Sequence, residues 1–177
     1  DLPIDELENS LVRSKADAIV FDTKLKEEIE EIKKRNTTKI TEYICMESGQ
    51  GYKSIPELVK EGKSKLEAGD TKFVDNEIDE NKMNILLFTS GTTSESKAVM
   101  LSQQNIASNI YALQCVEDIR STDKNIAFLP YHHIFGSVGQ IMMLACGVKT
   151  AFPDGLRYVK QNMQEYKVSV FIVVPIS

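Results

Sequence analysis

Short apolar segments alternate with amphipathic helical segments along this chain of 177 residues, and that order constrains its fold more than any other feature. We expect strands at 18–21, 39–45, 85–88, 126–129, 148–152 and 168–174. We expect helices at 5–15, 22–35, 54–69, 102–115, 135–146 and 156–166. Parallel strands need a crossover connection, usually a helix, so the alternation predicts an α/β fold with a mainly parallel sheet and helices on both faces. With no repeat or low-complexity linker, residues 1–177 are expected to form one compact domain.

Polar residues mark the starts of several helices. Ser54 and Glu57 have the spacing of a capping box, and Asp22 and Ser102 also stand where a helix should begin. The helix after Ser54 is expected to bury one apolar face, formed by Ile55, Leu58, Val59 and Leu66. The strand at 85–88 should lead straight into a loop and then into the helix after Ser102.

The stretch from Asn84 to Leu101 reads NILLFTSGTTSESKAVML, and its apolar first half ends in a loop rich in hydroxyl groups. The six residues of that loop are Thr89, Ser90, Gly91, Thr92, Thr93 and Ser94. Hydroxyls and free backbone N–H groups donate hydrogen bonds, glycine lets the backbone approach an anion closely, and Lys97 can add a positive charge. The pattern favours a phosphate site, while an ordinary turn is the structural alternative. A Walker-type loop does not fit, because it needs glycine at Ser96 and a hydroxyl at Ala98.

The segment Thr89 to Val99, TSGTTSESKAV, resembles the TSGTTGxPKGV phosphate loop of AMP-forming adenylating enzymes. This superfamily comprises acyl-CoA synthetases, peptide-synthetase adenylation domains and beetle luciferases. Ser94, Ser96 and Ala98 replace Gly, Pro and Gly, which changes loop stiffness more than charge or hydrogen-bond donors. The resemblance implies a phosphate loop at residues 89–97. Its ATP-binding residues would be Thr89, Ser90, Gly91, Thr92, Thr93, Ser94 and Lys97, with Lys97 also supporting catalysis.

The segment Asn125 to Gly136, NIAFLPYHHIFG, resembles the block that follows the phosphate loop in the same superfamily. His133 stands where long-chain acyl-CoA synthetases carry the His of an LPxxHxxE-like pattern, while Gly136 replaces the acidic residue often found there. This likeness implies that His133 lines the acyl pocket. A hydrogen-bonded loop pair or a metal site are the alternatives for His132 and His133, and zinc is disfavoured because no cysteine or carboxylate stands at ligand spacing.

The resemblance implies that the chain is an internal fragment of a large N-terminal domain. The parent would use ATP and Mg²⁺ to convert a carboxylic acid to acyl-AMP and then transfer the acyl group to coenzyme A. His133 and the methionine-rich segment with Met142 and Met143 favour a fatty acid. The family's adenine, ribose and magnesium ligands follow this region, so the fragment alone is expected to be inactive and its metal ligands are unknown. An amino-acid adenylation domain and a non-catalytic nucleotide-binding module remain alternatives.

Charge and cysteine content limit the partners and the cellular location that the sequence favours. Residues 1–82 hold 14 basic and 20 acidic side chains, and residues 83–177 hold 7 and 6, which together give the net charge of −5. A nucleic-acid partner is disfavoured because phosphate-backbone binding needs a basic face. No apolar run approaches the length of a transmembrane segment. Three widely spaced cysteines, Cys45, Cys115 and Cys146, are typical of a reducing, cytoplasmic location. The sequence does not indicate an oligomeric state.

Overall fold

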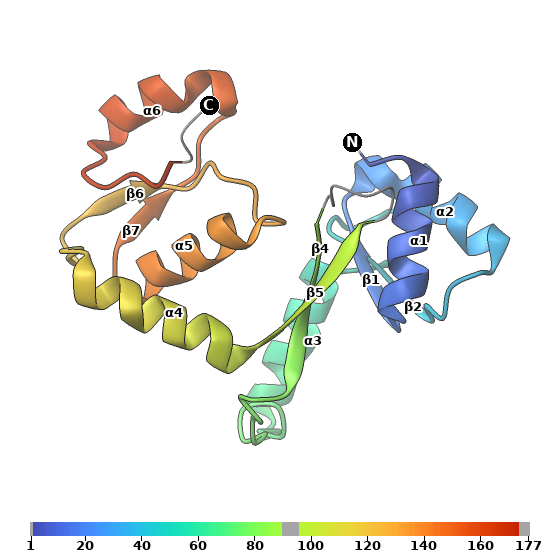
Figure 1. The fold of residues 1–177 in the computed structure, drawn as a ribbon. Helices are drawn as coiled ribbons and strands as arrows, with labels where there is room; N and C mark the ends of the chain where they lie inside the picture. Colours follow the sequence, from blue (N-terminus) through green and yellow to red (C-terminus); the bar gives the residue numbers. More distant parts are fainter. Residues whose placement is uncertain (1, 90–95, 174–177) are drawn as a thin grey trace. The chain divides into compact units, whose positions relative to one another are not determined.

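The computed structural model describes residues 2–89 and 96–173 of the chain. Contacts within the chain divide it into two compact units, Asp1–Ile78 and Asp79–Ser177, and each is described by itself. Helices and strands alternate, and parallel strand pairs occur in both units (Figure 1). The α/β prediction is therefore confirmed, while the assignment of residues 1–177 to a single domain stays a prediction.

The first unit is built on a parallel sheet with the strand order β1-β2-β3. These strands are β1 (Ala18–Phe21), β2 (Glu42–Cys45) and β3 (Lys53–Ser54). Helices α1 (Ile4–Ser14) and α2 (Lys26–Arg35) pack together beside it. The core consists of Phe21, Ile29 and Cys45, with partly buried neighbours that include Tyr52. The ring of Tyr52 meets that of Phe21 edge-on, with the centroids 5.2 Å apart.

Two capping residues predicted in this unit, Asp22 and Ser54, make capping hydrogen bonds, although α2 itself begins only at Lys26. Asp22 accepts a 2.9 Å hydrogen bond from the Lys24 backbone N–H, although a 3₁₀ turn, η1 (Thr23–Leu25), precedes α2. Ser54 and Glu57 form a complete capping box at the start of α3 (Ile55–Glu67). Each cap satisfies a backbone N–H group that the first helical turn leaves without a partner.

The predicted buried face of α3 is wrong. None of its residues is buried: Ile55, Val59 and Leu66 are exposed, and Leu58 is half-buried. The main contact of α3 within its unit is with β3, the two-residue strand that precedes it. Apolar spacing correctly predicted the helix, but it does not determine whether a partner surface covers the apolar side.

The second unit begins with an antiparallel hairpin that the sequence did not predict. Strand β4 (Met83–Thr89) pairs with β5 (Lys97–Ser102), and a register shift lies between Met83 and Ile85. We expected residues 85–88 to form a strand of a mainly parallel sheet and assigned no strand to residues 97–102. In the structure β4 pairs with β5 in the antiparallel sense, and this backbone pairing makes residues 97–102 a strand.

The rest of the second unit contains a parallel pair of strands joined by a helix. Its elements are α4 (Gln103–Val116), β6 (Lys124–Ile126), α5 (Ile134–Ala145), β7 (Lys149–Ala151), η2 (Leu156–Tyr158) and α6 (Val159–Tyr166). Ser102 and Asn105 form a capping box that confirms the predicted start of α4. Helices α5 and α6 lie on opposite sides of the β6–β7 pair (Figure 1), so this sheet is covered on both faces.

The last predicted strand, 168–174, is not formed in the described residues 168–173. Only its first part reaches the sheet, where the backbone N–H groups of Ser169 and Val170 donate to the carbonyl of Lys124 at 2.9 and 3.2 Å. The side chains beyond it still pack inward, since Val170 and Ile172 contact the core of the unit. The segment 170–173 therefore lies against that core without continuing the backbone ladder.

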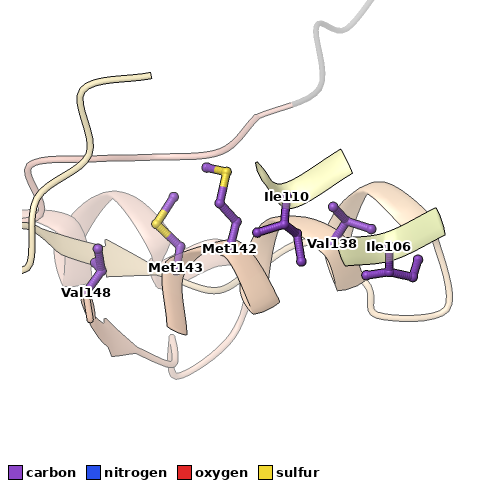
Figure 2. Close-up of a cluster of buried hydrophobic side chains, with 6 residues drawn as sticks. All are labelled: Ile106, Ile110, Val138, Met142, Met143 and Val148. Atoms are coloured by element: carbon purple, nitrogen blue, oxygen red, sulfur yellow. The ribbon is translucent and has the colours of Figure 1, made fainter. Parts of the chain in front are cut away.

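The core of the second unit lies between α4 and α5 (Figure 2). It consists of Ile106, Ile110, Val138, Met142, Met143 and Val148. Met143 is completely buried, so Met142 and Met143 serve first as packing residues of α5. Ile85 of β4 and Leu101 of β5 pack against the same cluster, which anchors the hairpin to the helices.

Candidate nucleotide and acyl site

The two ends of the proposed phosphate loop are joined by strand pairing. Thr89, the last residue of β4, lies directly opposite Lys97, the first residue of β5. The Thr89 hydroxyl donates to the carbonyl of Lys97 at 3.4 Å. Opposed residues of an antiparallel pair have Cα atoms about 4.5–5.5 Å apart. The threonine and the lysine of the motif are thus held side by side, and both side chains are exposed.

Five of the predicted ATP-binding residues lie outside the described residues: Ser90, Gly91, Thr92, Thr93 and Ser94. Their binding role stays a prediction, as do the roles of Thr89 and Lys97. What the structure adds is the anchoring of the hairpin. Ile85 and Leu101 fix β4 and β5 to the core of the second unit, at the end of the hairpin away from the loop.

The histidine block forms a tight turn at the start of α5. His133 is the N-terminal residue flanking the helix, and its backbone N–H donates to the carbonyl of Pro130 at 3.2 Å. Its imidazole makes no capping hydrogen bond and is exposed, with its ring centroid 4.4 Å from that of His132. The Ser137 hydroxyl donates to the carbonyl of Tyr131, which fastens the turn to the helix. The backbone therefore fixes the position of His133 and leaves its side chain accessible.

Glycine at position 136 has a steric reason. A Cβ atom there would lie 2.5 Å from the carbonyl oxygen of Pro130, closer than real Cβ contacts. The turn that carries His132 and His133 can therefore pack onto the first turn of α5 only if residue 136 has no side chain. This accounts for the glycine where the resembling block often carries an acidic residue.

The second unit contains an apolar groove of about 710 Å³. Its walls are α4, α5 and the segment 170–173, with Asn109, Phe135 and Ile172 among the lining residues. Ile134, next to His133, also lines it, but His133 itself does not. Of the lining residues, all of them within the described part of the chain, Glu117 alone is charged. The groove can bind an apolar chain, and the place of His133 in such a pocket stays a prediction.

A second glycine controls how closely the walls of the groove approach each other. A Cβ atom on Gly139 of α5 would lie 2.7 Å from Cδ1 of Ile172. The absence of a side chain at position 139 thus leaves the space that the end of the Ile172 side chain occupies. Sequence reasoning missed the groove, although the apolar spacing of Ile106 and Ile110 marked the face of α4 beside it.

No group of three or more His, Cys, Asp or Glu residues lies close enough to hold a metal ion within residues 2–89 and 96–173. Among these residues, none of the helices combines the length and apolar character needed to cross a membrane. Burial raises the pKa of the Tyr131 side chain, which stands directly before His132 and His133.

Comparisons with known proteins agree with the motif. The chain matches the AMP-binding enzyme family over residues 1–176. It is 29% identical over 127 residues to the chloroplastic long-chain-fatty-acid–[acyl-carrier-protein] ligase AEE15 of Arabidopsis thaliana, an alignment that covers 71% of this chain and 17% of that protein. It is 37% identical over 98 residues to long-chain-fatty-acid–CoA ligase 5 of Mus musculus, covering 52% of this chain and 14% of that protein.

The fold also has a close counterpart among solved structures. The luciferase-like enzyme of the nonluminescent mealworm Zophobas morio superimposes with a TM-score of 0.78 at 20% identity, covering 98% of this chain and 40% of the other. This chain spans less than half the length of each of these three proteins. The family match extends over nearly the whole chain, and the phosphate-loop motif falls within it. The chain therefore belongs to the AMP-binding enzyme family, the adenylate-forming enzymes that its phosphate-loop motif indicates.

Proposed function

We propose that this chain is part of an AMP-forming acid–thiol ligase. The whole protein would join a carboxylic acid, most simply a fatty acid, to the α-phosphate of ATP, releasing pyrophosphate and forming acyl-AMP. It would then transfer the acyl group to coenzyme A. The observation that carries this proposal is the phosphate-loop motif at the end of a β-hairpin, with Thr89 and Lys97 paired across it.

The nucleotide side of the reaction needs little covalent help from the protein. Adenylyl transfer depends on positioning the phosphates and on neutralising the charge of the leaving pyrophosphate. In our proposal Thr89, Ser90, Gly91, Thr92, Thr93 and Ser94 bind the β- and γ-phosphates. Lys97 steadies the loop or the pyrophosphate. Magnesium is proposed for the whole protein, but the described residues offer no cluster for it, so we assign it no ligand and no step.

We propose that the carboxylic acid binds in the groove beside α5. Its volume of about 710 Å³ lies within the range of roughly 300–1,000 Å³ typical of small-molecule sites. An almost uncharged lining suits an alkyl chain better than the charged ammonium group of an amino acid. His133, one residue before the groove, is proposed to stand at its entrance, near the carboxylate.

The acceptor and the location are further parts of the proposal. The names of the two relatives specify different thiol acceptors, an acyl carrier protein and coenzyme A, and we propose coenzyme A. A cytoplasmic location is supported by Cys45, Cys115 and Cys146, which are all free thiols. We propose no nucleic-acid partner.

Carboxylate-dependent exchange of pyrophosphate into ATP tests the function. The assay should use the full-length protein that contains this chain, with fatty acids of several lengths and with amino acids. Exchange that depends on fatty acids is the expected result, and exchange with amino acids alone would show a peptide-synthetase type of domain. A folded full-length protein that supports no exchange with any acid would refute the ligase assignment.

A further inference from the structure

Strand β6 contains a buried asparagine whose hydrogen bonding is incomplete. Asn125 is 2% exposed. Its Nδ2 donates to Gln140 Oε1 of α5 and to Thr150 Oγ1 of β7, each at the long distance of 3.5 Å. Its Oδ1 is buried and has no hydrogen-bond partner among the residues that the structure describes. Buried carbonyl oxygens are nearly always paired, so this atom calls for an explanation.

A small cavity lies beside this amide. It has a volume of about 20 Å³, and both Asn125 and Gln140 line it. Apolar residues such as Phe128, Leu129 and Ile172 form much of the remaining wall. A cavity needs roughly 10–15 Å³ to hold one water molecule, together with two or more polar partners. The space is therefore sufficient for one water molecule and too small for an organic ligand.

The chemistry of the amide favours water over an ion. Exchanging the oxygen and nitrogen of Asn125 would not solve the problem, because Nδ2 would then be the buried atom without a partner. A water molecule can donate to Oδ1 or accept from Nδ2, whereas a metal cation or an anion could serve only one of these arrangements. Gln140 offers the second polar group in either case.

We propose that one water molecule occupies this cavity and bridges the side-chain amides of Asn125 and Gln140. The bridge connects β6 to α5, and Thr150 extends the same polar network to β7. The cavity also touches Tyr131 and Gly136, so the water lies beneath the turn that carries His133. The site goes beyond the proposed function, since it requires neither ATP nor an acid.

Nuclear magnetic resonance on the ¹⁵N-labelled chain tests the proposal without any substitution. A bound water should give a cross-peak between the water resonance and the side-chain amide protons of Asn125. Asn162 is the matched control, because it is a buried asparagine whose amide is fully paired. Its Nδ2 donates to Asp154 Oδ2 at 2.9 Å, and its Oδ1 accepts from the Asp154 backbone N–H at 3.1 Å. We expect the cross-peak at Asn125 and none at Asn162.

Two variants identify the ligands of the water. Asn125→Leu removes one proposed partner and should abolish the water cross-peak at the Gln140 amide. If that variant does not fold, Gln140→Leu tests the same bridge from the other side and should abolish the cross-peak at Asn125. The proposal is overturned if the folded wild-type chain shows no water contact at Asn125. It is equally overturned if an atomic-resolution structure shows Gln140 donating directly to Asn125 Oδ1 beside a dry cavity.

Discussion

Two glycines of this chain should respond in opposite ways to the addition of one methyl group. Gly136 packs against the carbonyl of Pro130, whereas Gly62 on the exposed helix α3 would place a Cβ atom with nothing within 4 Å. Neither glycine has a positive φ. The two substitutions therefore differ in the space available for the Cβ atom and not in backbone strain. Packing requires the glycine at position 136, whereas the glycine at position 62 only makes α3 less stable than an alanine there would.

We expect Gly136→Ala to destabilise the second unit by about 1–3 kcal/mol, since a backbone oxygen must move to admit the Cβ atom. Gly62→Ala should stabilise α3 by about 0.5–1 kcal/mol, because alanine is the better helix former. Urea denaturation of the chain, followed by circular dichroism, measures both. Equal stability of the Gly136→Ala variant and the wild type would show that the turn at Pro130 moves freely.

The lysine of the phosphate loop carries the sharpest functional prediction. Lys97→Ala in the full-length protein should reduce pyrophosphate–ATP exchange by roughly 10²–10³-fold, the usual effect of losing one preorganised donor. Lys149→Ala, which removes another exposed lysine at the start of a strand of the same unit, is the control and should leave exchange unchanged. An undiminished rate in the Lys97→Ala variant would show that this lysine takes no part in the reaction.

Between elements, Arg35 joins helices α1 and α2 through several carboxylates. Its guanidinium lies 2.8 Å from Asp5, 2.6 Å from Glu8 and 3.3 Å from Glu31. Hydrogen bonds from Thr37 and Arg35 to Glu8 hold the pKa of that carboxyl below its ordinary value. Because the folded-state pKa is lowered, this contribution to stability is present at neutral pH and is lost as the pH falls through the folded-state pKa.

The Glu8→Gln variant should therefore lose stability at pH 7 and show a flatter decline of stability in acid than the wild type. Glu6→Gln, at an exposed position of the same helix, should retain the wild-type pH dependence. Denaturation midpoints measured from pH 3 to pH 7 compare the three proteins. Parallel curves for Glu8→Gln and the wild type would show that the contacts of Glu8 with Thr37 and Arg35 do not contribute to stability.

The groove offers a test of the contact between α5 and the segment 170–173. In Gly139→Ala the new methyl group must displace Ile172, which should narrow the groove. We expect exchange with long acids to fall by about tenfold while short acids are less affected, the scale of a methylene-sized mismatch. Leu144→Ala, at an exposed position of α5, is the control. An equal loss for all chain lengths would point to a folding defect and not to a narrowed site.

Local sequence signals predicted where the helices begin better than they predicted which strands pair. The capping residues Ser54 and Ser102 predicted the starts of α3 and α4, because a cap is read within a few residues of sequence. Strand β5 was missed because its conformation depends on pairing with β4, which no single segment reveals. The motif marked Thr89 and Lys97, which the structure places at the facing ends of β4 and β5, and their binding role stays a prediction. The groove could not be predicted because it arises from contacts between separate elements.

For the whole molecule, the extent of the chain relative to the compared proteins leads to a prediction. The chain spans less than half the length of each of the three proteins described above. We expect residues 1–177 to form no acyl-AMP and to bind triphosphate weakly at best, because one phosphate loop supplies only part of an adenylation site. Radiolabelled ATP with a fatty acid tests this, with the full-length protein as the positive control. Measurable acyl-AMP from the chain alone would contradict it.

Thr89 and Lys97, the two residues that bound the phosphate loop, form one rung of the β4–β5 ladder. The distance between the two anchors is set by that rung and not by the residues that separate them. An inserted residue would lengthen the loop without changing the pairing of Thr89 with Lys97. For a flexible loop, each doubling of length raises the entropic cost of closure by only about 0.6 kcal/mol. The serines at positions 94 and 96 therefore leave the separation of the threonine and the lysine unchanged, because strand pairing alone sets it.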